Sequence, residues 1–305
     1  FNIREFPLTR KGPVPDYRRE RWATPDGDFI DLDWLPHRPR APLVVLFHGL
    51  EGSSRSHYAQ ALMRELEHLG WNGVVPHFRG CSGEPNRLPR AYHSGDSEEI
   101  GWILHRIASV HQDAPRYAAG VSLGGNALLK WLGEQGNSAS SSIDAAAAIC
   151  PPLDLTVSGH ALATGFNRIY TRNFLMTLKR KALHKLGTLG GPCSPREVQA
   201  ARTLHEFDNV YTAPLHAFRD ADDYWKRASS KPWLPHIMLP TLLICACNDP
   251  FVPPSALPKS SELSPAVHFE TTAGGGHVGF LAGRWPGHLQ WLPQRLTGYF
   301  ADIAR

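Results

Sequence analysis

Gly120-Val121-Ser122-Leu123-Gly124 is the stretch that decides the fold, because it lies between a strand-like segment and a helix-like segment. Residues 117–119 before it form a short apolar run, and residues 125–132 after it place apolar groups at helical spacing. A Gly-x-Ser-x-Gly sequence in this context is typical of a nucleophile elbow, a sharp strand-to-helix turn that exposes one serine hydroxyl. Small residues are required on either side, because the serine backbone is strained and its neighbours pass close by. We therefore expect Ser122 to act as a nucleophile.

Strand-like and helix-like segments alternate on both sides of this turn. A predicted hairpin at residues 19–34 precedes a continuous apolar run at residues 43–47, as expected for a strand covered on both faces. The later segments are predicted as strands at 72–76, 116–121, 143–150, 241–247 and 267–271, and as helices at 56–69, 96–111, from 123 onward, and 286–304. This alternation predicts an α/β fold, with a mostly parallel, doubly wound sheet of eight strands.

The alternation stops in residues 153–235, where three helical segments are expected at 166–186, 200–207 and 221–229. We interpret residues 153–235 as a helical cap inserted between the sixth and seventh strands. Residues 1–152 and 236–305 then form the two parts of one core. The first helical segment of the cap is basic, and such a helix is most often a solvated face. Contact with anionic lipid or an acidic substrate is the alternative for this helix.

Four segments with chemically useful groups each follow a predicted strand. They contain Ser122, Asp249, His277 and the sequence His48-Gly49-Leu50-Glu51-Gly52. In an open α/β sheet, ligands bind in the crevice beyond the carboxyl ends of the strands. We therefore expect these groups to meet at one edge of the sheet.

Ester-cleaving chemistry requires this combination of groups. A serine hydroxyl is a poor nucleophile unless an imidazole removes its proton, which is the role expected for His277. A carboxylate on the second imidazole nitrogen, here Asp249, fixes the tautomer and stabilises the imidazolium. The oxyanion needs N–H donors placed in advance, for which we expect the backbone N–H groups of Leu50 and Leu123. The chain order Ser…Asp…His is the order expected for a fold in which the serine lies in an elbow of this kind.

Other residues compete for two of these roles. Asp154 follows the strand before the cap and is an alternative acid to Asp249. His268 within a strand and His288 within the closing helix are poorer candidates for the base than His277. His48 lies beside the expected oxyanion loop, and we interpret it as a residue that holds this loop.

The long connection between residues 76 and 95 is expected to have a task, because loops of this length usually do. His93 and Arg79 lie in it, and either substrate contact or ordering of the loop would explain them. Asp96 is predicted as the N-cap of the following helix, with Glu99 completing a pair like a capping box.

The composition excludes several classes of protein. The chain has 305 residues, 42% hydrophobic and 20% charged, with a net charge of +4, and its basic residues are scattered rather than striped, so we expect no nucleic-acid partner. Five cysteines suit a reducing compartment, and no segment approaches ~18 apolar residues. The first residues lack the order of a secretory signal, so we expect a cytoplasmic location. No ligand spacing for a metal occurs, and neither a metal nor another cofactor is expected.

These stretches resemble the α/β-hydrolase fold and, more narrowly, the YheT-like hydrolases, bacterial relatives of the mammalian lung α/β-hydrolase proteins. The resemblance runs over nearly the whole chain and is carried by residues 48–54, 76–86, 92–95, 120–126 and 275–280. It implies a serine carboxylic-ester hydrolase with the triad Ser122, Asp249 and His277 and without a cofactor. The resemblance implies activity on simple esters or on phospholipids, or transfer of acyl groups to alcohols.

We therefore expect hydrolysis of a small-molecule ester with a short to medium acyl chain, through an acyl-enzyme. A slot lined by Phe166, Ile169 and Leu175 of the cap would size the acyl group. Acyl transfer to an alcohol, lipase or phospholipase activity, and a non-catalytic binding protein on the same scaffold are the alternatives. Transient contact of the basic cap with a membrane or lipid is a further alternative. The sequence does not predict an oligomeric state.

Overall fold

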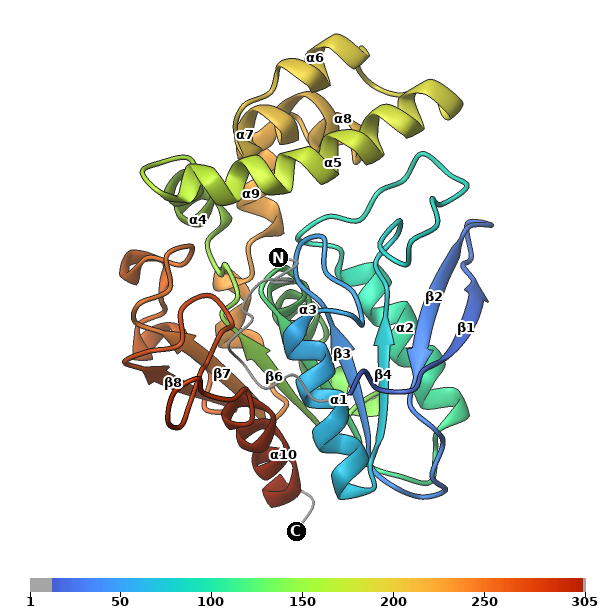
Figure 1. The fold of residues 1–305 in the computed structure, drawn as a ribbon, viewed down its shortest axis with the longest axis vertical. Coiled ribbons are helices and arrows are strands. Elements are labelled where there is room, and N and C mark those ends of the chain that lie inside the picture. Colours follow the sequence, from blue (N-terminus) through green and yellow to red (C-terminus); the bar gives the residue numbers. More distant parts are fainter. Residues whose placement is uncertain (1–12, 304–305) are drawn as a thin grey trace.

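The computed structural model describes residues 13–303, and its centre is one eight-stranded sheet with the strand order β1-β2-β4-β3-β5-β6-β7-β8 (Figure 1). The strands are β1 (Arg18–Ala23), β2 (Phe29–Trp34), β3 (Leu43–Phe47), β4 (Asn72–Pro76), β5 (Arg116–Val121), β6 (Ala145–Ile149), β7 (Thr241–Ala246) and β8 (Val267–Thr272). The pairs β1/β2 and β2/β4 are antiparallel, and every other neighbouring pair is parallel. The predicted α/β fold, with a mostly parallel sheet of eight strands, is confirmed.

Helices cover both faces of the sheet, which explains why its central strands are apolar throughout. The helices of the core are α1 (His57–Leu69), α2 (Ser97–Val110), α3 (Leu123–Gln135) and α10 (Trp291–Ile303). One apolar cluster joins the sheet to α2 and α3, and a second cluster on the other face joins it to α1 and α10. The closing helix begins five residues later than predicted, so His288 lies in the loop before it rather than in the helix.

Residues 153–235, which we call the cap segment, lie between β6 and β7 and gather together beyond the sheet (Figure 1). Their helices are α4 (Leu155–Leu162), α5 (Asn167–Leu189), α6 (Pro195–Ala200), α7 (Leu204–Phe207), α8 (Ala213–Leu215) and α9 (Ala221–Ala228), with a π-helical turn at Asp208–Thr212. The predicted helix at 200–207 is replaced by α6 and α7. Ser194 and Thr203 each accept a hydrogen bond from a backbone N–H three residues on, and so each begins a helix of its own.

The two connections of the cap segment are tied to each other and to the core. The backbone N–H of Leu155 donates to Ser229 Oγ (2.9 Å), and that of Lys231 donates to the Leu153 carbonyl (2.9 Å). The Asn126 amide on α3 donates to the Ala228 carbonyl (2.8 Å) and accepts from the backbone N–H of residue 230 (2.9 Å). The C-terminal end of the cap segment is therefore bonded to the helix that follows Ser122, and the N-terminal end is bonded to the C-terminal end.

The predicted capping box at the start of α2 is wrong. Asp96 occupies the N-cap position, but its carboxylate accepts no capping hydrogen bond and is paired with Arg90 Nη2 at 2.7 Å. Glu99 is paired with Arg79 Nε at 2.7 Å. Burial, together with the charge of Asp96, raises the pKa of Glu99 to about 7. The capping box does not form because Glu99 is used elsewhere: the buried Arg79 guanidinium needs carboxylate partners, and this tertiary contact outweighs the local cap.

Within residues 13–303, no helix combines the length and the apolar character that crossing a bilayer would require.

Candidate active site

The turn after β5 has the strained backbone that the sequence predicted. Ser122 has φ 52° and ψ −118°, a conformation that side-chain-bearing residues rarely adopt. A Cβ at Gly120 would lie 2.6 Å from the Gly124 carbonyl oxygen, and one at Gly124 would lie 2.5 Å from the Phe47 carbonyl oxygen. Only glycine therefore fits at both positions, and the close packing fixes the serine at the start of α3.

The imidazole of His277 lies between a hydroxyl and a carboxylate. Its Nε2 is 2.9 Å from Ser122 Oγ, and its Nδ1 is 2.9 Å from Asp249 Oδ2 and 3.1 Å from Oδ1. The buried Asp249 carboxylate also accepts from the backbone N–H of Phe251 (2.8 Å), which fixes its orientation. With the carboxylate on Nδ1, this nitrogen carries the proton and Nε2 is free to accept the serine proton. The structure thus brings together the three side chains that the sequence singled out.

The alternative acid, Asp154, has a different task. It is the N-cap of α4, and its Oδ1 accepts a hydrogen bond from the backbone N–H of Val157 (3.1 Å). A side chain that caps a helix in this way satisfies one of the free N–H groups of its first turn.

The two expected oxyanion donors both line the pocket that contains Ser122. Leu123 is the first residue of α3, so its backbone N–H has no acceptor within the helix and lies at the positive end of the helix dipole. Leu50 belongs to the loop after β3. The residues around Leu50 decide whether its N–H can point at a substrate.

His48 bonds the loop of Leu50 through its side chain. Its fully buried ring donates from Nδ1 to the Gly49 carbonyl (2.8 Å) and accepts at Nε2 from the backbone N–H of Phe78 (3.1 Å). Burial lowers the pKa of His48 to about 3, so the neutral form that makes both bonds persists. The Tyr58 hydroxyl accepts from the Gly49 N–H (2.8 Å). These contacts support the interpretation of His48 as a residue that orders the loop.

Glu51, beside Leu50, makes contacts that the sequence analysis did not anticipate. Its Oε1 is 2.7 Å from Lys181 Nζ on α5 and 2.7 Å from the Tyr92 hydroxyl, which donates to it. The backbone N–H of Glu51 donates to the same hydroxyl (2.9 Å), while Lys181 Nζ is also 3.4 Å from Cys81 Sγ. A cation of the cap segment is therefore attached directly to the loop of Leu50.

The prediction that the basic helix is simply a solvated face is wrong for its second half. Lys185 is buried and donates to the carbonyls of Leu88 (2.8 Å) and Arg90 (2.5 Å) in the long 76–95 loop. Burial lowers the pKa of Lys185 to about 8. Together with Lys181, it fastens α5 to two loops of the core, whereas Arg168 and Arg172 in the first half are exposed.

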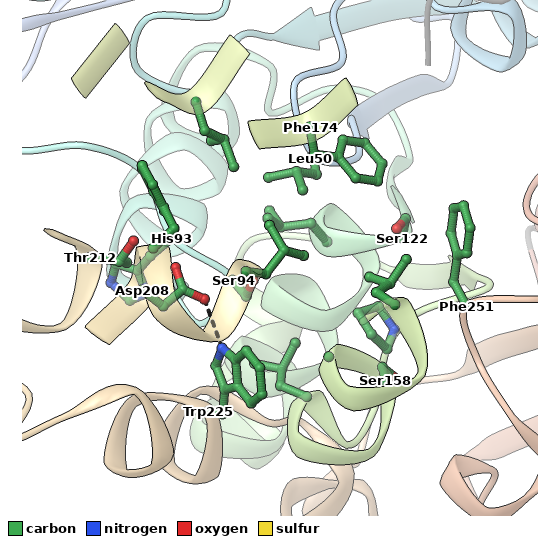
Figure 2. A pocket seen from close by; sticks show the side chains of 18 of the residues that line it. Leu50, His93, Ser94, Ser122, Ser158, Phe174, Asp208, Thr212, Trp225 and Phe251 are labelled. Carbon is green, nitrogen blue, oxygen red and sulfur yellow. Dashed lines mark hydrogen bonds between the residues drawn. The ribbon is translucent and has the colours of Figure 1, made fainter. Parts of the chain in front are cut away.

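The pocket at Ser122 encloses about 840 Å³ between the core and the cap segment, its open mouth included (Figure 2). The slot predicted from Phe166, Ile169 and Leu175 is wrong in its residues. Phe166 and Ile169 are exposed, at 88% and 58%, and Leu175 is buried inside the cap segment. The side chains of α5 that line the pocket are instead Phe174 and Leu178, which lie one turn apart on another face of the helix.

The far side of the pocket from Ser122 is polar (Figure 2). Asp208 and Thr212, at the two ends of the π-helical turn, line it together with His93. The Trp225 indole N–H donates to Asp208 Oδ2 (2.8 Å). Burial raises the pKa of Asp208 to about 6. No motif marked Asp208 in the sequence, because it stands in a segment without recognisable periodicity.

The long loop contributes both order and pocket lining. Arg79 is buried and pairs with Asp26 Oδ2 (2.8 Å) as well as with Glu99, so it orders the loop. His93 lines the pocket, and its Nδ1 accepts from the Gly95 N–H (3.2 Å). Burial lowers the pKa of His93 to about 3, which keeps this ring neutral.

Among residues 13–303, no group of three or more histidine, cysteine, aspartate or glutamate side chains is arranged to hold a metal ion.

Comparison with known proteins gives a consistent result. The family model described as the alpha/beta hydrolase fold matches residues 42–283. The chain is 42% identical over 285 residues to "Putative esterase YheT" of Escherichia coli, covering 92% of this chain and 83% of that protein. It is 32% identical to "Phospholipase ABHD3" of Mus musculus, covering 95% and 72%.

A third relative is "Medium-chain fatty acid ethyl ester synthase/esterase 2" of Saccharomyces cerevisiae, 32% identical over 86% of this chain and 62% of that protein. Among solved structures, the esterase Pf2001 of Pyrococcus furiosus superposes with a TM-score of 0.59 at 15% identity, covering 97% of this chain and 95% of that chain. At this identity the likeness shows the shared fold.

Proposed function

Because the chain belongs to the α/β-hydrolase family and is an enzyme of the esterase type, we propose that it hydrolyses carboxylic esters of short to medium acyl chain. The single observation that carries this proposal is the position of the His277 imidazole, between the Ser122 hydroxyl and the Asp249 carboxylate. The three groups stand in a pocket that is mostly apolar, which suits an acyl chain.

The first half of the reaction forms an acyl-enzyme. Ser122 Oγ attacks the ester carbonyl carbon while His277 Nε2 takes its proton, and Asp249 stabilises the resulting imidazolium. The carbonyl oxygen becomes an oxyanion that accepts from the N–H groups of Leu50 and Leu123. When the tetrahedral intermediate collapses, the C–O bond to the alcohol breaks and His277 returns its proton to the leaving oxygen.

The second half releases the acid by the same route. Water, deprotonated by His277, attacks the acyl carbon, and the bond to Ser122 Oγ breaks as His277 protonates the serine. The bonds broken and formed balance without any cofactor. The chain length accepted depends on the space between Ser122 and the polar far side of the pocket.

Acyl transfer is the second candidate reaction, and the name of the yeast relative, an ester synthase and esterase, favours keeping it. The same acyl-enzyme would be attacked by an alcohol in place of water. Phospholipase activity, suggested by the name of the mouse relative, would use the same steps on a glycerolipid ester. A non-catalytic binding protein would leave the hydroxyl of Ser122 unreactive.

The test combines a covalent probe with product analysis. A fluorophosphonate probe should label the wild-type protein and a Ser158→Ala variant but not Ser122→Ala. Ser158 is the matched control, because it lines the same pocket and its buried hydroxyl makes no hydrogen bond among the described residues. Labelling of Ser122→Ala at the wild-type rate, or no labelling of the wild type, would exclude the proposal.

Products made in buffer with added ethanol separate the two reactions. Mostly free acid indicates hydrolysis, and mostly ethyl ester indicates transfer. Rates measured over p-nitrophenyl esters of increasing acyl length should pass through a maximum and then decline. Rates that keep increasing toward long chains would contradict a short to medium acyl chain.

We further infer that the first half of α5 contacts an anionic lipid surface. Phe166, Ile169 and Met176 are exposed, at 88%, 58% and 60%, beside the exposed Arg168 and Arg172. The whole of α5 carries no acidic residue. Apolar side chains flanked by cations are the pattern of helices that lie in the membrane interface.

Vesicle sedimentation tests this contact. The protein should bind vesicles that contain phosphatidylglycerol better than vesicles of phosphatidylcholine alone, and a Phe166→Ser/Ile169→Ser variant should lose binding. Val110→Ser is the control, because Val110 is 63% exposed but lies on α2 of the core. Equal binding by the double variant and the wild type would refute the contact.

A further inference from the structure

The pocket at Ser122 has a second polar region, whose side chains take no part in the proposed hydrolysis. Asp208 and Thr212 reach it from the cap segment, and Figure 2 shows them on the opposite side of the pocket from Ser122. Both stand at the ends of one π-helical turn, in which the backbone N–H of Ala213 donates to the Asp208 carbonyl. Such turns are rare and occur frequently at functional sites.

The Asp208 carboxylate is incompletely compensated. An ionised carboxylate offers about four acceptor positions; Trp225 fills one of them through its indole N–H (2.8 Å), and a hydrogen bond from the Thr212 side chain also acts on it. Among residues 13–303, no lysine or arginine pairs with Asp208, and the Nε2 of the neighbouring His205 is itself 3.0 Å from Asp222 Oδ1. Two uncharged donors could be held by an uncharged acceptor, so the charge calls for another partner.

Most of the side chains that line the pocket together with Ser122 and Asp208 are apolar. They include Leu155, Leu162, Phe174, Leu178, Leu204 and Phe207, while Ser94 and Ser158 add two hydroxyl groups. A substrate arm that runs from the reacting carbonyl toward Asp208 is therefore mostly in contact with hydrocarbon until its end. At that end it meets an acceptor with negative charge.

We propose that the preferred substrate is an ester with one apolar arm ending in a hydrogen-bond donor, a hydroxyl or a primary ammonium group, which Asp208 accepts. This inference rests on the proposed function and adds the chemistry of the far end of the substrate. A methyl end would leave the carboxylate desolvated without a partner, and a carboxylate end would be repelled. Thr212, at the other end of the same turn, lines the pocket beside Asp208, and a hydrogen bond from its side chain acts on that carboxylate.

The test compares matched esters that differ only at their far end. Two series are used: p-nitrophenyl alkanoates with hydroxyl, ammonium, methyl or carboxylate ends, and acetates of alkanols with the same four ends, each over four to ten carbons. The wild type should prefer the hydroxyl or ammonium end over the methyl end of equal length by about tenfold or more in kcat/KM, as expected for a hydrogen bond to a charged group. The preference should be confined to a narrow range of lengths.

Two substitutions connect the preference to Asp208. Asp208→Leu should abolish it and raise kcat/KM for the methyl-ended ester relative to the donor-ended one. Asp208→Asn keeps an acceptor for Trp225 and a hydroxyl, so it should lose the ammonium preference and retain most of the hydroxyl preference. Glu197→Gln is the control, because Glu197 is an exposed carboxylate on α6 of the same cap segment, and it should change neither ratio.

The possible outcomes separate this inference from the proposed function. Hydrolysis of methyl-ended esters with no preference for a donor end at any length, in either series, would overturn the inference and leave the esterase standing. Absence of hydrolysis of every ester, together with absence of fluorophosphonate labelling, would instead remove the proposed function. If Asp208→Leu does not fold, the ammonium-to-hydroxyl ratio of Asp208→Asn still decides, and a ratio equal to that of the wild type counts against Asp208.

Discussion

The ammonium group of Lys181 lies 2.7 Å from the Glu51 carboxylate, and this ion pair joins α5 to the loop that contains Leu50. Glu51 itself has a positive φ of 56°, a conformation that needs support from its surroundings. The Tyr92 hydroxyl supplies part of that support by bonding both the backbone and the side chain of Glu51. The position of the Leu50 N–H therefore depends on the cap segment.

Lys181→Met should lower kcat about tenfold and change KM much less. The substitution releases Glu51 from α5, and small misplacements of a catalytic donor cost up to ~10²-fold in rate. Affinity for a trifluoromethyl ketone, which forms the oxyanion, should fall in parallel. Lys179→Met is the control, because Lys179 donates to the Gln199 carbonyl within the cap segment. An unchanged kcat in Lys181→Met would show that the ion pair does not position the loop.

Ser122→Gly should unfold at higher urea concentration than the wild type, while Ser122→Ala should not. Glycine adopts φ 52° without the steric cost that a Cβ imposes, a strain on the order of 1 kcal/mol after the greater entropy of the unfolded glycine is counted. Both variants should lack activity. Equal urea midpoints for the two variants would mean that the elbow stores no strain.

Asp249→Asn should reduce kcat by about 10⁴-fold, because an amide cannot hold the His277 tautomer that leaves Nε2 free. Asp154→Asn should retain activity and stability, since asparagine caps a helix about as well as aspartate. Steady-state kinetics on one short ester decides between the two carboxylates. The reverse pattern would assign the acid to Asp154.

Fluorophosphonate labelling should be slower at pH 5 than at pH 7, because only a neutral imidazole can act as the base. A protonated His277 has no lone pair with which to accept the serine proton. The rings of His48 and His93 are not responsible, because burial lowers the pKa of each to about 3 and both stay neutral throughout. A labelling rate that is independent of pH over this range would argue against His277 as the base.

Asp208→Asn should stabilise the protein at pH 7.5, by on the order of 2 kcal/mol in urea unfolding. Burial raises the folded-state pKa of Asp208 from 3.8 to about 6. The folded state therefore binds the proton more tightly, and the wild type loses stability as pH rises through this window. Above it the full cost of the buried charge is present, so the gain from asparagine should shrink at pH 5. A gain that is the same at both pH values would mean that Asp208 is not held in a desolvated place.

The sequence predicted most of the elements and the convergence of the three side chains, because the signals are local. The Gly120–Gly124 spacing is dictated by backbone contacts within one turn, and residues that follow parallel strands must meet at one edge. The roles of these residues stay predictions until the substitutions are made. What the local signals could not give is the contact of one segment with another.

The face of α5 shows the difficulty. Both faces of this helix carry apolar side chains, so periodicity alone did not reveal which one is turned inward. Phe174 and Leu178 share the inward face with Lys181 and Lys185, whose charges suggested solvent. Their partners lie far away in the chain: Glu51 is 130 residues from Lys181, and the Leu88 carbonyl is 97 residues from Lys185. Asp208 was missed for a related reason, since only the enclosed pocket distinguishes it from other aspartates.

The base of the cap segment is held by hydrogen bonds of Leu155, Ser229 and Asn126. Away from this base, the ammonium groups of Lys181 and Lys185 bond α5 to two loops of the core. An entrance opened on that side would have to break the Lys181–Glu51 ion pair, and the same break would release the loop of Leu50. Entry of substrate by that route and support of the Leu50 loop by Lys181 would therefore exclude one another.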